Sequence, residues 1–242
     1  MIKVEYLRHT GDDLSVVNAA RVSHASASDW EVTCQCGQPV EEPCGTSACM
    51  YNANERLSAK DVKLVNFLAK HKHKSPFNHA FVTFRIKAPI FVARQLVKHE
   101  YMPWNEVSRR YVEGGLDFYC PPNGDWRSQP VDVKQGSGDP LPRHVVAELR
   151  NHYARLCVAA EALYDTMILK GLSREQARMV LPQSLMTEWV WSGSLFAFAK
   201  MCALRLDNHT QKESQYVAEQ VNAKLAELFP VSWAALKEHG AT

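Results

Sequence analysis

The sequence lacks the features that mark membrane proteins, secreted proteins and nucleic-acid-binding proteins. It contains no uninterrupted apolar run of about 18 residues, the length that a membrane-spanning helix needs. Its first residues, MIKVEYLRHTGDD, contain no apolar core of a signal peptide. The formal net charge is only +2, so no overall field attracts nucleic acid or an anionic membrane. We therefore expect a cytoplasmic protein that binds neither nucleic acid nor a membrane, and in which any anion site is local.

Several common catalytic motifs are absent as well. The sequence has no G-x-G-x-x-G after a predicted strand, no P-loop and no G-x-S-x-G. These absences argue against Rossmann, phosphoryl-transfer and hydrolase functions. No cysteine stands in an evident nucleophile context beside a histidine, and there are no internal repeats or low-complexity tracts.

What the chain does contain is typical of a soluble globular protein with one large domain or two small ones. Its 242 residues are 46% hydrophobic and 22% charged, and a chain of this size can bury a substantial core. No clear domain boundary is visible, so we predict a single domain over residues 1–242. The predicted fold class is α+β: a small mixed sheet flanked by helices, with a helical C-terminal half.

The N-terminal half is predicted to combine short strands with helices. Apolar patterns predict strands at residues 2–7 and 80–87. The segment DLSVVNAARVS is helix-like, and LSAKDVKLVNFLAKH predicts a helix that begins at a capping box of Ser58 and Asp61. Pro89 opens a further helix, IFVARQLVKH, three of whose polar side chains share one face at spacings i, i+3 and i+4. These three residues are Gln95, Lys98 and His99.

The C-terminal half is predicted to be mostly helical. A long helix runs over residues 143–169 and stops at Gly171. A second helix begins at Ser173, where Gln176 completes a capping box. The last predicted helix is ended by Pro230. The remaining two helices are expected at residues 187–205 and 209–228.

An irregular, cysteine-rich insertion interrupts the chain at about residues 29–56. It holds four of the seven cysteines, spaced C-x-C-x7-C-x4-C, without the paired C-x2-C knuckles of common zinc sites. Free thiols or a disulfide are favoured, so we predict no metal site, although a structural zinc ion stays open. Cys120, Cys157 and Cys202 lie in apolar surroundings that predict reduced core thiols. The cysteines of the insertion are Cys34, Cys36, Cys44 and Cys49.

The most informative segment is KHEYMPWNEVSRRY, residues 98–111. Basic side chains stand before and after its turn. Arginine offers a planar fork for phosphate oxygens, and a serine hydroxyl or a turn N–H adds neutral donors. A solvated charged loop is the alternative. Tyr101, Trp104 and Tyr111 are interleaved with the charges, which favours a site for a phosphorylated ligand.

Three further clusters could bind a ligand or could be structural. HKHKSPFNH, residues 71–79, does not match the spacing of a zinc motif; it supplies imidazole and hydroxyl donors, or it is a helix C-terminus whose basic groups face the dipole. Arg174 and Arg178 lie one turn apart near a helix start, which suits an anion, with surface charge as the alternative. Arg205 follows an apolar helix and either binds a ligand or forms a partly buried ion pair.

Taken together, these motifs resemble the flavin-dependent thymidylate synthases. The signature of that family is R-H-R, seven residues and S, usually extended as N-E-x-S-x-R-Y. Here Lys98, His99 and Glu100 take the first three places, and Ser108 closes the signature. The similarity extends to DLSVVNAARVS, HKHKSPFNH, FRIKAPIFVARQ, REQARMVLP and LRLDNH, which covers most of the chain outside the insertion and a Gly/Pro-rich connector. The extension is matched by Asn105, Glu106, Arg110 and Tyr111.

The resemblance implies a reaction. Members of the family methylate dUMP to dTMP with methylenetetrahydrofolate as the carbon donor and FAD that NADPH reduces, and they are homotetramers whose sites combine several subunits. Arg205 matches the arginine that faces the uracil ring, where a guanidinium stabilises negative charge and makes C5 nucleophilic. Arg205 is therefore the expected catalytic residue, and no enzyme nucleophile is required.

The resemblance also implies two sets of contact residues. The expected FAD contacts are His73, Ser75, Lys98, His99, Glu106, Ser194 and Lys200. The expected dUMP contacts are Gln95, Lys98, Glu106, Val107, Ser108, Arg109, Arg110, Arg178 and Arg205.

The chain departs from the family at the expected flavin contacts. Glu100 reverses the charge of the third signature position, and Ser194, Phe196 and Lys200 stand where the family tends to have Asn-x-Arg and a later Asn. One hypothesis is that Lys200 replaces a lost positive charge. Two alternative functions stay open: a flavin-dependent hydroxymethylase acting on dUMP or dCMP, and a non-catalytic nucleotide-binding relative.

Overall fold

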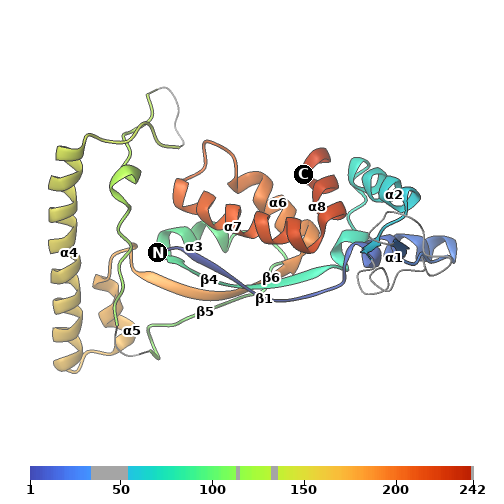
Figure 1. Cartoon of the computed structure of the whole chain (residues 1–242). Coiled ribbons are helices and arrows are strands. Elements are labelled where there is room, and N and C mark those ends of the chain that lie inside the picture. The colour runs from blue at the N-terminus through green and yellow to red at the C-terminus, as the bar shows by residue number, and fades with distance from the viewer. Residues whose placement is uncertain (34–53, 113–114, 132–135, 241–242) are drawn as a thin grey trace, which may run out of the picture. The chain divides into compact units, whose positions relative to one another are not determined.

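The computed structural model describes residues 1–33, 54–112, 115–131 and 136–240, and Figure 1 labels most of their helices and strands. The chain forms two compact units and passes between them several times. Because neither unit is one contiguous segment, no single boundary could be visible in the sequence; a single domain stays a prediction. Unit 1 consists of Met1–Leu7, Thr83–Ser192 and Leu204–Val221, and unit 2 of Arg8–Val82, Gly193–Ala203 and Asn222–Thr242.

One four-stranded sheet consists of β1 (Lys3–Thr10), β4 (Phe81–Pro89), β5 (Trp104–Glu106) and β6 (Met186–Ser194). The strand order is β1-β4-β6-β5, and β5 pairs antiparallel with β6. This register places Trp104 opposite Trp191 and Glu106 opposite Trp189. The Trp104 ring stacks on Trp189, with 4.4 Å between centroids, so β5 and β6 share an aromatic face.

The prediction of a helix from residue 187 is wrong, because residues Met186–Ser194 form strand β6. The sequence MTEWVWSGS contains aromatic and β-branched residues, which pack well on a pleated surface. Trp189 and Trp191 are both buried and both contact Trp104 across the sheet. The predicted helix therefore starts only at Leu195, as α6 (Leu195–Arg205).

The helices of unit 1 include the long α4 (Arg143–Leu169), which has the predicted bounds. The helix stops as expected, because Gly171 has φ +85° and its N–H donates to the Ile168 carbonyl at 2.9 Å. Unit 1 also contains the short helices α3 (Ile90–Leu96) and α5 (Arg174–Ala177) and the 3-10 turn η4 (Arg178–Val180), and α7 (Lys212–Leu228) begins in it.

Two predicted features of the short helices are wrong. Helix α3 ends at Leu96, so Lys98 and His99 lie in the turn that follows rather than on one helical face with Gln95. The Ser173 side chain makes no capping hydrogen bond to α5, although the helix does begin after it.

Unit 2 contains α1 (Asp13–Arg21), the antiparallel strands β2 (Glu31–Thr33) and β3 (Asn54–Arg56), α2 (Ala59–Lys70), most of α6, and α8 (Pro230–His239). The predicted start of α2 is confirmed, since the Ser58 side chain accepts from the Asp61 N–H. Pro230 opens α8 rather than only ending the preceding helix. The reason is distant in sequence, because the buried Asp13 carboxylate accepts from the N–H groups of Val231 and Ser232 at 2.9 and 2.8 Å. Three-residue 3-10 turns lie at Val22–His24, Pro76–Asn78 and, in unit 1, Asn123–Asp125.

Asp61 also links α2 to α1 in the interior of unit 2. Its carboxylate accepts from the Arg21 guanidinium and from the Ser28 hydroxyl at 3.0 Å. Burial by itself would raise the pKa of Asp61, but hydrogen bonds from Arg21, Ser58 and Ser28 outweigh it and hold the pKa below its ordinary value. The charged pair is therefore a stabilising contact of this unit.

The four cysteines of the insertion lie outside the described residues. Cys157 and Cys202 are buried free thiols, as predicted, and burial raises the pKa of Cys202. Cys120 is exposed, which corrects the prediction of a third core thiol. None of the helices in the described part of the chain combines the length and the apolar content that a membrane crossing needs.

Candidate functional site

The end of α6 and the end of α3 meet in unit 1 at Arg205. The Nε of this guanidinium donates to Nε2 of His99 at 3.2 Å, and an Nη donates to the Gln95 carbonyl at 3.1 Å. Both acceptors are neutral. Within the described part of the chain, no carboxylate pairs with Arg205, so the structure does not support the alternative of an ion pair.

The charge of Arg205 is consequently not cancelled by a neighbour. Burial lowers the pKa of its guanidinium, which nevertheless remains protonated because an arginine titrates far above neutral pH. A half-buried cation held by two neutral acceptors keeps further N–H donors for a ligand. This arrangement can stabilise negative charge on a bound molecule.

The two signature residues on either side of His99 are placed differently from it. His99 is half-buried and its ring lies 6.3 Å from that of Trp191. Lys98 and Glu100 are exposed. The reversed charge of Glu100 therefore stands in water, where its effect on a nearby anion is weak.

Glu106 is fixed by two donors from the sheet. Thr187 on β6 donates to one carboxylate oxygen at 2.8 Å, and the Trp104 indole N–H donates to the other at 3.1 Å. Since Trp104 is itself stacked on Trp189, the carboxylate has a defined position at the end of β5. The sequence alone could not show Thr187, because its contact depends on the pairing of β5 with β6.

A pocket of about 130 Å³ in unit 1 brings four of the predicted contact residues together. They come from the end of β5 and from η4, segments that are distant in sequence. One wall is largely apolar, formed by residues that sequence reasoning did not assign to the site because they carry no charge. The predicted residues are Glu106, Val107, Arg109 and Arg178, and the others are Ile90, Leu181, Leu185, Met186 and Thr187.

Arg110 joins Arg178 beside this pocket through a shared neighbour. An Arg110 Nη lies 3.5 Å from a Glu175 carboxylate oxygen, and Arg178 Nε donates to the Glu175 carbonyl at 3.2 Å. The Ser108 hydroxyl accepts from the Arg110 N–H at 3.3 Å. Helix α5 is too short to contribute a strong dipole, so the arginine charges carry any anion binding here, contrary to the idea of a helix-start site.

A second group of predicted residues lies in unit 2. His73 and Ser75 are exposed, and so is Lys200 on α6. Ser194 is buried; its hydroxyl donates to the Asn78 side-chain oxygen at 2.7 Å and accepts from the Ala197 N–H at 3.2 Å, which caps α6. Its main role in the described structure is thus to start this helix.

Phe196, one of the departures from the family pattern, has a cationic neighbour. The Lys74 ammonium lies 5.4 Å from the centre of the Phe196 ring, a cation–π distance. Lys74 belongs to an exposed run of basic and imidazole side chains that follows α2. This run is His71, Lys72, His73 and Lys74.

Unit 1 has a larger cavity of about 510 Å³, but none of the predicted contact residues lines it. Its wall is largely apolar and includes Phe118, Tyr119 and Tyr216. Among the described residues, no group of three or more histidine, cysteine or acidic side chains is placed to hold a metal ion. The arginine-lined pocket and the Arg205 cluster are therefore the best candidates for binding an anionic ligand.

Comparisons with known proteins point in the same direction. The Thy1 family, described as thymidylate synthase complementing protein, matches residues 5–231. A flavin-dependent thymidylate synthase of Thermus thermophilus is 33% identical over 237 residues, which cover 98% of this chain and 76% of that protein. The enzyme of the same description from Treponema pallidum is 32% identical, with 98% and 69% covered.

Solved structures are similar as well. The crystal structure of the UMP/dUMP methylase PolB from Streptomyces cacaoi bound with 5-Br UMP has a TM-score of 0.80 and 27% identity, covering 100% of this chain and 96% of that one. The structure of PolB bound with 5-Br dUMP has a TM-score of 0.78 and 28% identity, with 100% and 97% covered. These similarities confirm the predicted fold class.

Proposed function

Because this chain belongs to the family of flavin-dependent thymidylate synthases, we propose that it catalyses the reductive methylation of dUMP to dTMP. The observation that carries the proposal is the half-buried Arg205 guanidinium, held by neutral acceptors and without a carboxylate partner among the described residues. Such a cation stabilises negative charge that develops on a pyrimidine ring as C5 becomes nucleophilic.

The other end of the nucleotide is assigned to the arginine-lined pocket. Ser108, Arg110 and Arg178 supply hydroxyl and guanidinium donors for the phosphate, with Arg109 and Val107 beside them. A dianionic phosphate competes with the exposed Glu175 carboxylate for Arg110, since that ion pair is long and solvated. Gln95, Lys98 and Glu106 complete the expected contacts.

The residues of unit 2 fit a flavin that carries a pyrophosphate. The exposed run from His71 to Lys74 and the exposed Lys200 offer positive charge and N–H donors to a dianion. The proposed FAD contacts of unit 2 are His73, Ser75, Ser194 and Lys200, and those of unit 1 are Lys98, His99 and Glu106. When bound, the flavin supplies the methylene- and hydride-transfer chemistry, while the chain orients the reactants. NADPH as reductant, methylenetetrahydrofolate as carbon donor and a cytoplasmic location belong to the same proposal.

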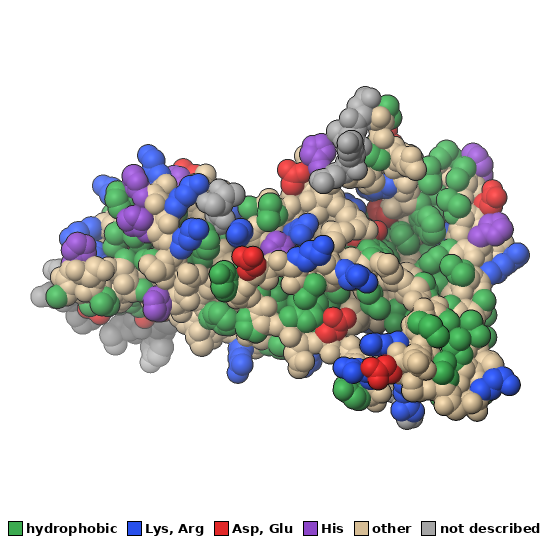
Figure 2. Space-filling model, turned by 180° about the vertical axis from the view of Figure 1, so that it is seen from behind, with side chains coloured by type: hydrophobic (Ala, Val, Ile, Leu, Met, Phe, Trp, Pro, Cys, Tyr) green, Lys and Arg blue, Asp and Glu red, His purple; other side chains and the backbone are tan. Residues whose placement is uncertain are grey.

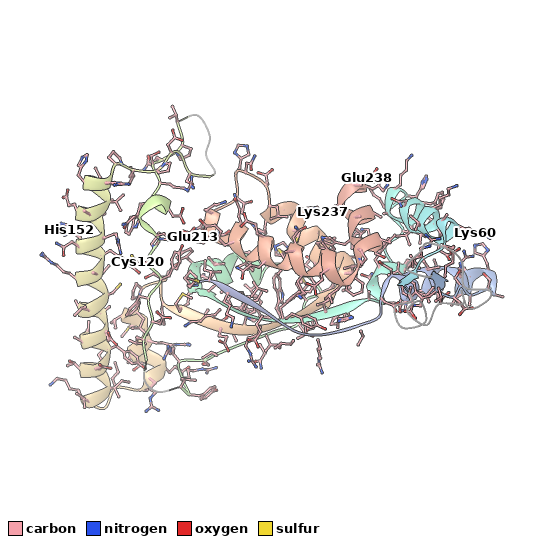
Figure 3. All side chains as sticks on the ribbon, viewed as in Figure 1. Lys60, Cys120, His152, Glu213, Lys237 and Glu238 are labelled. Atoms are coloured by element: carbon pink, nitrogen blue, oxygen red, sulfur yellow. The ribbon has the colours of Figure 1, made fainter. Side chains whose placement is uncertain are left out.

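The exposed face of α4 supports the proposed homotetramer. Leu149, Leu156 and Leu163 recur every seven residues and are 39%, 58% and 46% exposed. Figure 2 shows hydrophobic side chains along this helix at the right of the view, and His152, which Figure 3 labels, lies on the same face between the first two leucines. Leucines seven residues apart form an apolar stripe on one side of the helix, a surface suited to pack against a helix of another copy. Light scattering should give a smaller assembly for Leu156→Glu than for Leu156→Met; an unchanged mass would contradict this role of α4.

The proposed reaction is tested by product mass. FAD-loaded protein is incubated with methylenetetrahydrofolate, NADPH and either dUMP or dCMP. We expect dTMP from dUMP and no product from dCMP or without NADPH. A hydroxymethylated product would favour the hydroxymethylase instead, and protein that shows no flavin absorbance after FAD is added would defeat both enzyme functions.

A further inference from the structure

The side chain of Gln95 is anchored at both ends of its amide. Its oxygen accepts from the Ser214 hydroxyl at 3.0 Å, and its nitrogen donates to the side-chain oxygen of Gln211. The backbone carbonyl of Gln95 also accepts a hydrogen bond from the Arg205 guanidinium. Gln95 is thus tied to three residues of the same unit, of which only Arg205 was expected to contact substrate.

The two amide partners come from the start of α7, where the backbone is firmly held. The Gln211 carbonyl accepts from the N–H groups of Ser214 and Gln215 at 2.9 and 3.1 Å. The Gln215 amide donates to the carbonyls of Asp207 and Thr210 at 3.1 and 2.8 Å, which closes the loop between α6 and α7. Figure 3 labels Glu213 in this first turn. The loop that follows Arg205 is therefore connected by hydrogen bonds to the start of α7, whose residues Gln211 and Ser214 hold the Gln95 side chain.

The Ser214 side chain is completely buried. A buried hydroxyl costs free energy unless it makes a hydrogen bond, and the Ser214 hydroxyl donates its hydrogen bond to the side-chain oxygen of Gln95. A glutamine amide can otherwise turn over, exchanging its donor and its acceptor. Two anchors favour one of these orientations before a ligand binds.

We infer that Ser214 and Gln211 are positioning residues that hold the Gln95 amide in the orientation that binds the nucleotide. This inference rests on the proposed function, because it takes Gln95 as a contact of dUMP. With both ends anchored, the amide presents its remaining N–H and its remaining lone pair in constant positions, so binding does not have to order it.

The first test removes the anchor and measures dUMP affinity on FAD-loaded protein by calorimetry. Ser214→Ala should raise the dissociation constant of dUMP roughly five- to tenfold, which corresponds to about 1–1.4 kcal/mol. The matched control is Ser232→Ala in unit 2, which removes an equally buried hydroxyl that has no hydrogen-bond partner among the described residues. Ser232→Ala should leave dUMP affinity unchanged, and bound flavin and Tm are measured for each variant.

A double-mutant cycle separates positioning from a general structural role. If Ser214 acts through Gln95, Ser214→Ala should have no further effect in a Gln95→Ala background. Two variants of Gln211, which is not a core residue, give an independent comparison. Gln211→Met removes the acceptor of the Gln95 N–H and should weaken dUMP binding. Gln211→Glu keeps an acceptor oxygen and should leave dUMP binding near the wild-type level. This second pair decides the matter if Ser214→Ala lowers Tm strongly.

The outcomes distinguish this inference from the proposed function. Wild-type protein that binds FAD but not dUMP would overturn both. Wild-type binding that Gln95→Ala weakens, while Ser214→Ala and Gln211→Met leave it intact, would overturn the positioning role alone. Equal effects of Ser214→Ala with and without Gln95 would overturn it too.

Discussion

The expected nucleotide contacts of unit 1 and the expected flavin contacts of unit 2 are organised differently. In unit 1, Arg205, Gln95 and Glu106 are each held by defined hydrogen bonds from neighbouring elements. In unit 2, His73, Ser75 and Lys200 are exposed, whereas Ser194 is buried and caps α6. A residue held before binding gives up little entropy when the ligand arrives, whereas an exposed side chain is ordered only by the ligand. We infer that Arg205, Gln95 and Glu106 are ordered before the nucleotide binds, whereas His73, Ser75 and Lys200 are ordered by the cofactor.

The largest effect on the nucleotide site is expected when the positive charge of Arg205 is removed. Arg205→Ala should lower kcat for dUMP about 100- to 1000-fold, because the guanidinium stabilises charge on the ring. Flavin absorbance should stay as in the wild type. Arg94→Ala, an exposed arginine on α3, serves as the control and should keep full activity. Equal losses for both variants would argue against a specific role of Arg205.

The Arg21–Asp61 pair tests how much the buried interior of unit 2 contributes to stability, independently of the exposed ligand contacts. Arg21→Leu should lower the free energy of unfolding by about 3 kcal/mol, because it leaves a buried carboxylate without its charged partner. Arg56→Leu breaks the exposed pair with Glu31, 3.4 Å apart, and should cost under about 1 kcal/mol in urea unfolding.

The pH dependence of this stabilisation follows from the lowered pKa of Asp61. A lowered folded-state pKa means that the contribution is fully present above the ordinary value of 3.8 and is lost as the pH falls below it. The difference between wild type and Arg21→Leu should therefore shrink on going from pH 7 to below pH 3.8. A constant difference would show that the charge of Asp61 is not involved.

A smaller effect on dUMP binding is expected when the hydrogen bond from Thr187 to Glu106 is removed. Thr187→Val removes the hydroxyl that donates to this carboxylate while keeping the size of the side chain, and should weaken dUMP binding roughly five- to tenfold. Thr83→Val is the matched control, since Thr83 is also buried in the sheet but bonds to Ser192. Nucleotide affinity that does not distinguish the two variants would contradict a defined position for Glu106.

The smallest effect concerns the hypothesis that Lys200 supplies positive charge to the flavin. Lys200→Ala should weaken FAD binding only about threefold, because the group is exposed and screened, and should leave dUMP affinity unchanged. Lys60→Ala on α2, labelled in Figure 3, removes another exposed lysine and controls for net charge. FAD affinity that Lys200→Ala does not change would refute the hypothesis.

Local sequence patterns predicted the elements whose causes are local. The bounds of α4 and the Ser58 cap of α2 agree with the prediction because periodicity, a glycine stop and a capping serine act within a few residues. The helix predicted from residue 187 was wrong because the tryptophans of β6 find their partner on β5. Helix α8 was missed because Pro230 was interpreted only as the end of the preceding helix, although proline also opens helices; the Asp13 carboxylate that accepts from its first N–H groups lies at the other end of the chain.

Motifs that place a lysine, a histidine, a serine and several arginines in a recognised order are enough to identify the family. How these groups are held depends on the fold: Arg205 donates to neutral acceptors, Thr187 donates to Glu106, and Ser214 donates to Gln95. The two kinds of information act over different ranges. Motif residues are recognised by their spacing along the chain. A hydrogen bond between α3 and α7, by contrast, exists only once the chain has folded and these two helices lie next to each other.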